Sequence, residues 1–304
     1  MRPAFSVVFL TTLIGAAQGL FLALFAAEFL GSVPRELLVR ASIAVVVLAA
    51  GGLVASFFHL GRPERAWRSA AMWRTSWLSR EVIALPAFMV LAAAYGWARA
   101  HDASGAVLLG IGASVACLAL FFCTAMIYAS IRFLQEWASP FTAANFVLMG
   151  CASGLTLAAG LAALFAPALS PAYAAWAVAA TLLAFAVRMA SLARNARLVP
   201  RSTTRSAIGA RSAPVQQKSR GFTGGSFNTH EFFHGVGAGG MRTVRALFVL
   251  LAFIVPAVLL AAARGSQAMI VAAFIVQYAG LVAERWYFLA DARHPQNLYY
   301  QSVA

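Results

Sequence analysis

Charged residues are scarce in this chain of 304 residues, and their scarcity excludes the ordinary soluble enzymes. Only 11% of the residues are charged, whereas soluble domains carry about 25%. Acidic residues are rarest, with nine Asp and Glu against 23 Lys and Arg, so the net charge is +14. Because 62% of the residues are hydrophobic, the composition indicates an integral membrane protein. Its function must then depend on a few polar side chains.

Cysteine is equally rare, which excludes two kinds of metal centre. Cys117, Cys123 and Cys151 all fall within apolar stretches, and no Cys-x-x-Cys pair occurs. An iron–sulfur cluster or a thiolate zinc site needs about four ligands. We therefore expect the three cysteines to be packing residues and predict no metal site in this chain.

Long apolar stretches account for most of the sequence. A helix needs roughly 20 apolar residues to cross a bilayer, and eight stretches approach or reach that length: 5–30, 37–60, 82–99, 104–131, 141–166, 170–193, 246–263 and 266–283. The fold class predicted from them is all-α. We expect one membrane domain over residues 1–304, built as a bundle of about eight transmembrane helices.

Positive charge is concentrated on one side of the predicted bundle. An even number of helices places both termini on one side, together with the loops after the second, fourth and sixth helices. That side carries 19 of the 23 Lys and Arg residues. The positive-inside rule then places both termini in the cytoplasm, which predicts a multi-pass protein of the bacterial inner membrane. We interpret the arginines as topology signals and as contacts for membrane lipid or an acidic partner, with no role for nucleic acid.

Two long cytoplasmic connections are predicted to form a platform for a soluble partner. The segment 61–80 is basic and contains Trp67, Trp73 and Trp77, and tryptophan favours the membrane interface. The segment 195–241 is rich in Gly, Ser, Thr and Arg, and loops of such length are usually functional or disordered.

Histidine patterns in the chain favour neither a zinc enzyme nor a haem protein. The run His230-Glu231-Phe232-Phe233-His234 matches the H-E-x-x-H zinc motif, but neighbouring glycines oppose a long helix. We interpret these histidines as contacts for a partner or for lipid. A haem between two spans needs paired histidines, and only His59 ends an apolar stretch. We therefore expect no haem, with a haem b anchor and a small-molecule transporter kept as alternatives.

His59 and Glu81 are the candidate site residues. His59 ends the second predicted helix and Glu81 opens the third, so both are expected on the cytoplasmic face. Capping or headgroup contacts would also explain them. The functional interpretation is a quinone pocket, because quinone reduction needs two protons and both side chains can exchange protons near neutral pH when partly buried. Arg80 would hold the carboxylate, and Trp77 would form a wall of the pocket.

Other polar residues of the apolar stretches have less specific interpretations. Glu284, Arg285 and Tyr287 are predicted to complete the quinone pocket or to pair with one another. Gln18 is expected to hydrogen-bond a neighbouring helix, and Glu28 is expected near the outer membrane surface.

Three segments together resemble a known family. The block FHLGRPERA at residues 58–66, the block SWLSRE at residues 76–81 and the closing AERWYF at residues 283–288 are similar to the membrane anchor subunits of the dimethyl sulfoxide reductase family. The resemblance implies eight spans and a complex with a molybdopterin catalytic subunit and a ferredoxin-like iron–sulfur subunit. It also implies electron exchange with a quinone, ubiquinone or menaquinone. His59 and Glu81 match the residues that the family ties to its quinol site.

Within this family, the predicted cytoplasmic face resembles the membrane-bound sulfite dehydrogenase branch. The chain itself would have no catalytic residues. It would pass electrons between its partner and the quinone pool, in sulfite oxidation or, alternatively, as the quinol-oxidising anchor of a dimethyl sulfoxide-type reductase. The residues expected to dock the iron–sulfur subunit are arginines of the first long loop and the last helix: Arg62, Arg65, Arg68, Arg74 and Arg285.

Overall fold

The protein is an all-helical bundle in the computed structural model, which describes residues 1–31, 33–210, 215 and 232–298. Eight helices are long and apolar enough to cross a membrane, as the sequence predicted. They are α1 (Phe5–Leu30), α2 (Arg35–Phe57), α3 (Trp77–Ala100), α4 (Ala106–Ala129), α5 (Pro140–Phe165), α6 (Ser170–Ala196), α9 (Ala238–Val249) continued by α10 (Val255–Ala262), and α11 (Gln267–Asp291). Short helices cover Pro63–Ala70, Pro167–Leu169, Thr204–Ala207 (α7) and Pro295–Leu298.

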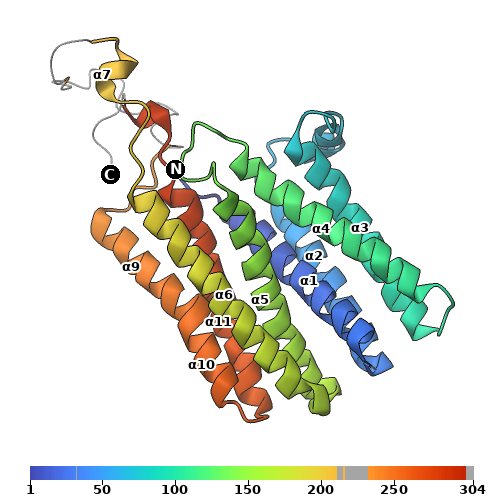
Figure 1. Ribbon diagram of the computed structural model, residues 1–304. Helices are drawn as coiled ribbons and strands as arrows, with labels where there is room; N and C mark the ends of the chain where they lie inside the picture. The colour runs from blue at the N-terminus through green and yellow to red at the C-terminus, as the bar shows by residue number, and fades with distance from the viewer. Residues whose placement is uncertain (32, 211–214, 216–231, 299–304) are drawn as a thin grey trace.

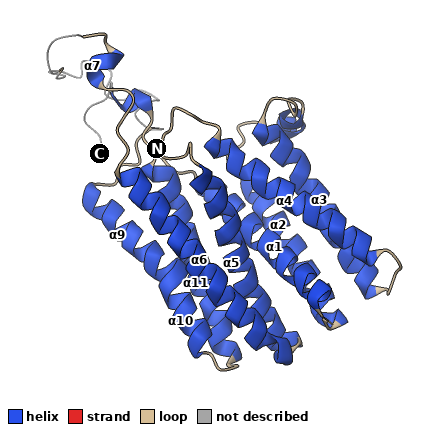
Figure 2. Cartoon of the chain, in the orientation of Figure 1, coloured by secondary structure: helices blue, strands red, loops and turns tan. Residues whose placement is uncertain are grey.

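The helices lie side by side in two groups that meet along α1 and α5. Figure 1 shows α1 to α4 on one side and α5, α6 and α9 to α11 on the other, and Figure 2 shows helices and loops without a strand in the described part of the chain. The helix α1 packs against both α2 and α5, and α11 packs against α5, α9 and α10. The seam between the two groups positions the site described below.

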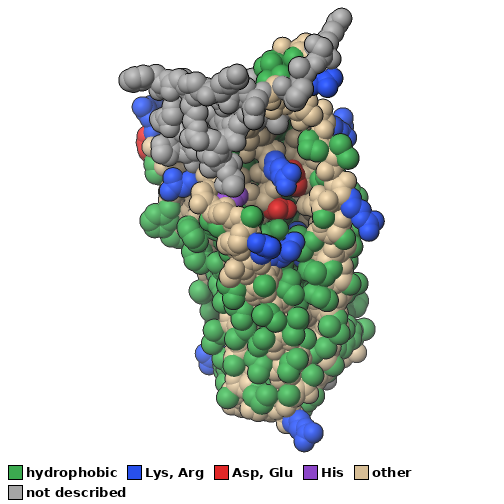
Figure 3. Space-filling model, turned by 90° about the vertical axis from the view of Figure 1, so that its left-hand side faces the viewer, with side chains coloured by type: hydrophobic (Ala, Val, Ile, Leu, Met, Phe, Trp, Pro, Cys, Tyr) green, Lys and Arg blue, Asp and Glu red, His purple; other side chains and the backbone are tan. Residues whose placement is uncertain are grey.

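The outer surface of the bundle is apolar along most of its length. Side chains such as Val47, Val90 and Leu182 are more than half exposed, in agreement with a lipid-facing surface. Figure 3 shows hydrophobic side chains covering the middle of the molecule in that view and most of the visible Lys and Arg side chains near one end. That end holds the turns after α2, α4 and α6. It also holds the N-terminal amino group, which donates to the carbonyl oxygens of Ala290 and Ala292 at 3.1 Å each.

The backbones of α1 and α5 touch at a pair of glycine motifs. Gly15 and Gly19 of α1 face Gly150 and Gly154 of α5, each pair spaced by four residues. A Cβ atom at Gly154 would lie 2.0 Å from the carbonyl carbon of Gly19, and one at Gly19 would lie 2.0 Å from the carbonyl oxygen of Gly150. Small residues at such crossings allow close helix packing in membranes, so these glycines bring the two groups together.

Substitution of Gly154 by alanine is therefore expected to separate α1 from α5. We expect Gly154→Ala to lower the free energy of unfolding by at least about 2 kcal/mol, because overpacked backbones must move apart. Thermal unfolding of the purified protein in detergent would measure the loss. The matched control is Gly160→Ala in the same helix, where nothing lies within 4 Å of a built Cβ atom. Equal melting temperatures for the two variants would contradict the role given to this crossing.

The seventh span contains one turn of π-helix shortly before a proline. Pro256 has no N–H group, so the carbonyl group of Ala252 loses its usual helical partner. The intervening turn Leu250–Ile254 is π-helical, and Gln277 of α11 donates to the oxygen of Ala252 at 3.3 Å. The helix α11 can approach the π-helical turn closely because it has glycine at position 280. A Cβ atom there would lie 2.2 Å from the nitrogen of Ala252.

Three helix boundaries differ by five residues or more from the sequence prediction and change the position of polar residues. The seventh span begins at Ala238 instead of residue 246. The third helix begins at Trp77 instead of residue 82, so Arg80 and Glu81 lie within it. The last helix continues to Asp291 instead of ending at residue 283. Glu284 and Arg285 therefore belong to the interior of the bundle.

Candidate functional site

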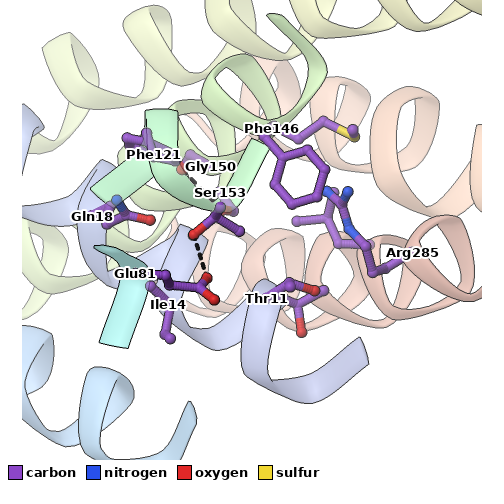
Figure 4. Close-up of a pocket in the computed structure, with 14 residues that line it drawn as sticks. Thr11, Ile14, Gln18, Glu81, Phe121, Phe146, Gly150, Ser153 and Arg285 are labelled. Carbon is purple, nitrogen blue, oxygen red and sulfur yellow. Dashed lines mark hydrogen bonds between the residues drawn. The ribbon is translucent and has the colours of Figure 1, made fainter. Parts of the chain in front are cut away.

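A small polar cavity lies in the seam of the bundle, toward the arginine-rich end. Residues from α1, α3, α4, α5 and α11 line it. Figure 4 shows Glu81 and Arg285 on opposite sides of this cavity, with Phe146 beside Arg285. Hydroxyl side chains complete the polar part of the wall: Thr11, Thr12, Thr124 and Ser153. The cavity thus has a carboxylate on one side and a guanidinium on the other, inside an apolar bundle.

Glu81 points into the bundle from the first turns of α3. The helix begins after Ser76, whose side chain accepts a hydrogen bond from the backbone N–H of Ser79 at 3.3 Å, so Glu81 lies in the second turn. The side chain of Glu81 is 7% exposed and accepts a hydrogen bond from Thr124 Oγ1 at 2.5 Å. Thr124 therefore holds the carboxylate in place.

Arg80 does not hold the carboxylate of Glu81, which corrects the role we expected for it. Its Nε donates to the carbonyl oxygen of Trp73 at 2.9 Å, and its Nη2 donates to that of Arg74 at 2.8 Å. The guanidinium lies 4.1 Å from the centre of the Trp77 ring. Arg80 thus fixes the loop before α3 to the start of that helix.

Trp77 forms an aromatic pair beside the buried carboxylate. Its ring meets that of Phe122 edge to face, with the ring centres 5.3 Å apart. Phe122 is 52% exposed and lies on α4. Trp77 precedes Glu81 by one turn of α3, so the pair stands at the outer surface, one helical turn from the buried carboxylate.

Arg285 is enclosed by the bundle, so the prediction that it docks a partner subunit is wrong. The residue is 4% exposed, because α11 extends past it by six residues. Its guanidinium carbon lies 3.8 Å from the centre of the Phe146 ring, a cation–π contact. The Nε atom has no hydrogen-bond partner among the described residues. A buried guanidinium with unused donors is costly, and here it lies at the edge of a polar cavity.

A buried ion pair supports Arg285 from behind. Arg188 of α6 lies 2.7 Å from Glu284, and Arg285 lies 3.8 Å from the other oxygen of the same carboxylate. The predicted pairing of Glu284 with Arg285 is therefore confirmed. Arg188 was not among the predicted site residues, although a charge inside an apolar stretch is itself a signal. With two cations and one anion, the three side chains leave one positive charge facing Glu81 across the cavity.

The size of the cavity limits what it can hold. About 20 Å³ is open to the centre of a water-sized sphere, which is room for about one ordered water molecule. A quinone ring does not fit inside it. A water molecule between a carboxylate, a guanidinium and several hydroxyl groups can pass protons, so the cavity suits proton exchange better than ring binding.

His59 lies outside the cavity, in the turn that follows α2. Its side chain is largely exposed, and its backbone N–H donates to Ser56 at 3.4 Å. Partial burial lowers the pKa of His59 from its usual value. The structure places His59 at the same end of the bundle as Glu81 without bringing the two side chains together in the cavity.

Several other predicted residues have separate positions in the structure. Arg62, Arg65, Arg68 and Arg74 lie at the surface of the segment between α2 and α3. His230 and Glu231 lie outside the described residues, and the described part of the chain holds no cluster of three His, Cys, Asp or Glu side chains. Gln18 donates to the carbonyl oxygen of Cys117 at 2.9 Å, which confirms its predicted interhelical bond.

Glu28 forms a polar group of its own at the opposite end of the bundle. It accepts a hydrogen bond from Tyr95 and forms an ion pair with Arg99. Between this group and the cavity lie fully buried apolar side chains that include Leu20, Phe21 and Leu24. The two polar groups are therefore separate.

Comparison with known proteins places these features in a family. The profile of the family described as DMSO reductase anchor subunit (DmsC) matches residues 1–300. The chain is also 51% identical, over 325 aligned positions that cover 100% of both chains, to a sulfite dehydrogenase subunit of Allochromatium vinosum.

Proposed function

Because the chain belongs to the DMSO reductase anchor subunit family, we propose that it carries electrons between a partner iron–sulfur subunit and the quinone pool. The partners would be a ferredoxin-like iron–sulfur subunit and a molybdopterin catalytic subunit. The likeness to a sulfite dehydrogenase subunit over the whole chain supports sulfite oxidation as the overall reaction. Electrons would then flow from the partner to the quinone.

The observation that carries this proposal is the position of Glu81 and Arg285 in the lining of one water-sized cavity. Reduction of a quinone takes up two electrons and two protons. Glu81 would give one proton to a quinone oxygen and regain it through the cavity from the arginine-rich end. Arg285 would offset the negative charge left on Glu81 between these two steps, since opposite charges attract more strongly inside a protein than in bulk water.

The quinone ring would lie at the Trp77–Phe122 pair. The cavity itself is too small for a ring, whereas this aromatic pair includes the half-exposed ring of Phe122 and lies one turn of α3 before Glu81. His59, at the same end of the bundle, is the candidate donor of the second proton. These residues provide contacts and protons, and the electrons come from the partner subunit.

We place the arginine-rich end in the cytoplasm, with the partner subunits bound there. In support, the opposite end has only four arginines among the described helix ends and turns: Arg35, Arg40, Arg99 and Arg264. Short loops rich in Lys and Arg stay on the cytoplasmic side. The surface arginines Arg62, Arg65, Arg68 and Arg74 would then contact the iron–sulfur subunit.

Removal of the Thr124 hydroxyl tests the proposed proton exchange. We expect Thr124→Val to slow sulfite-dependent quinone reduction roughly tenfold, because Glu81 loses the hydrogen bond that orients it. The assay uses the purified complex with a soluble quinone analogue. The matched control is Thr156→Val in α5, a fully buried threonine that donates to Ala152 within its own helix. An unchanged rate in Thr124→Val would argue against Glu81 as the proton donor.

The reverse reaction and a haem protein remain the two competing functions. A quinol-oxidising anchor of a DMSO-type reductase would use the same residues, and the family description favours it. A complex that reduces quinone with sulfite and does not reduce dimethyl sulfoxide with quinol would decide for sulfite oxidation.

We expect the purified chain to give no sharp visible band in a reduced-minus-oxidised spectrum. Such a band would show a haem and contradict the proposal.

A further inference from the structure

A second hollow lies at the arginine-rich end, where the loop between α4 and α5 meets the end of α6. It is lined by Arg132, Gln135, Ala138, Arg194, Leu198 and Arg201. About 310 Å³ of it is open to the centre of a water-sized sphere, compared with 20 Å³ in the cavity beside Glu81. Three of its lining residues are arginines, and within the described chain none is acidic. The hollow is therefore strongly basic and large enough for a phosphate group.

Hydrogen bonds centred on Gln135 hold the walls of this hollow together. The backbone oxygen of Gln135 accepts from both terminal nitrogens of Arg194 at 3.1 Å each. The side-chain oxygen accepts from the backbone N–H of Arg201 at 3.1 Å, and Nε2 donates to the oxygen of Val199 at 3.2 Å. These bonds join the α4–α5 loop to the segment after α6. The hollow is thus a fixed site and not a gap between loose loops.

The three arginines have no ion-pair partner among the described residues. In the part of the chain that the structure describes, none of Arg132, Arg194 and Arg201 forms an ion pair. Cations gathered around one hollow repel each other unless an anion lies between them. Guanidinium groups bind phosphate oxygens through paired hydrogen bonds. The arrangement therefore calls for a phosphate-bearing ligand from outside the chain.

The position of the hollow identifies the source of that phosphate. It lies level with the ends of α4 at Ala129, α5 at Pro140 and α6 at Ala196, the depth at which lipid headgroups surround a membrane protein. Phe133 is 57% exposed and Val199 is 80% exposed beside it, so apolar side chains border the basic site. We infer that this hollow binds the phosphate of an anionic phospholipid headgroup. This inference does not depend on the quinone reaction.

Lipid titration of the purified full-length complex tests the inference. Native mass spectrometry would follow the binding of phosphatidylglycerol, phosphatidylcholine and inorganic phosphate in separate experiments. The test variant Arg132→Gln/Arg201→Gln leaves Arg194 and its structural hydrogen bonds intact. The control variant Arg242→Gln/Arg245→Gln removes the same charge from exposed positions at the start of α9.

We expect phosphatidylglycerol to bind the wild type more tightly than phosphatidylcholine. The test variant should bind it roughly tenfold more weakly, because each arginine near an anionic lipid adds to its attraction, and the control should retain wild-type affinity. Equal binding of the two lipids, or an equal loss in the control, would overturn the inference. Displacement of the lipid by millimolar phosphate would show a site for free anions. Loss of the partner subunits from the test variant, with lipid binding unchanged, would show a protein interface.

Discussion

Glu81→Gln is expected to slow quinone reduction by about a hundredfold or more while the complex still assembles. A positioned acid or base contributes on the order of 10²- to 10⁴-fold to a proton-transfer step. The amide has nearly the same shape as the carboxylate and can still accept the hydrogen bond from Thr124, so the helices should pack as before. The variant thus removes the proton and leaves the bundle unchanged.

Two assays on the same preparation would isolate the effect of this substitution. Sulfite oxidation with a soluble electron acceptor reports on the catalytic partner and should stay at the wild-type rate. Sulfite-dependent quinone reduction should fall. The control variant is Glu28→Gln, which changes a carboxylate of similar setting at the opposite end of the bundle and should leave both rates unchanged. Normal quinone reduction in Glu81→Gln would remove this residue from the mechanism.

Arg285→Met is expected to slow quinone reduction by roughly ten- to a hundredfold without loss of the partner subunits. Methionine can fill much of the same space against Phe146, and Glu284 keeps its ion pair with Arg188. What disappears is the positive charge that faces Glu81 across the cavity. Transition-state interactions of a single charged group have effects of this size. Co-purification of the partners distinguishes this role from docking, since a docking residue would lose the partners first.

The matched control for Arg285→Met is Arg99→Met. Arg99 pairs with Glu28 at the opposite end, so its loss also breaks an ion pair within a span. We expect both variants to lower the melting temperature, but only Arg285→Met to slow quinone reduction. Arg285→Lys, which keeps the charge, should recover part of the rate. If Arg99→Met slowed the reaction equally, the effect would be one of general destabilisation.

The helices could be predicted from the sequence because bilayer thickness sets a length that hydropathy reveals. All eight spans follow from this rule. The ends of the helices do not follow from it, because a polar residue buried inside the bundle interrupts an apolar stretch in the same way as the end of a helix does. Hydropathy ends the last helix just before Glu284 and Arg285, whereas α11 continues for six residues beyond them. Buried partners such as Arg188 make those extra turns possible, and partners on other helices cannot be read from local composition.

The candidate site could be predicted in part. Glu81 stands out in the sequence because it opens an apolar stretch in a chain with only nine acidic residues. Thr124 does not stand out, because a threonine in an apolar helix usually bonds to its own backbone, as Thr156 does. The role expected for Arg80 was wrong because residues adjacent in sequence on a helix point in different directions. Contacts across α3, α4 and α11 depend on tertiary packing.

Photolabelling of the intact complex with an azido-quinone would locate the ring that accepts the electrons. We predict labelled peptides from the start of α3 and the end of α4, around Trp77 and Phe122, with labelling suppressed by excess unmodified quinone. Label confined to the opposite end of the bundle, near Tyr95 and Arg99, would contradict a quinone site beside Glu81.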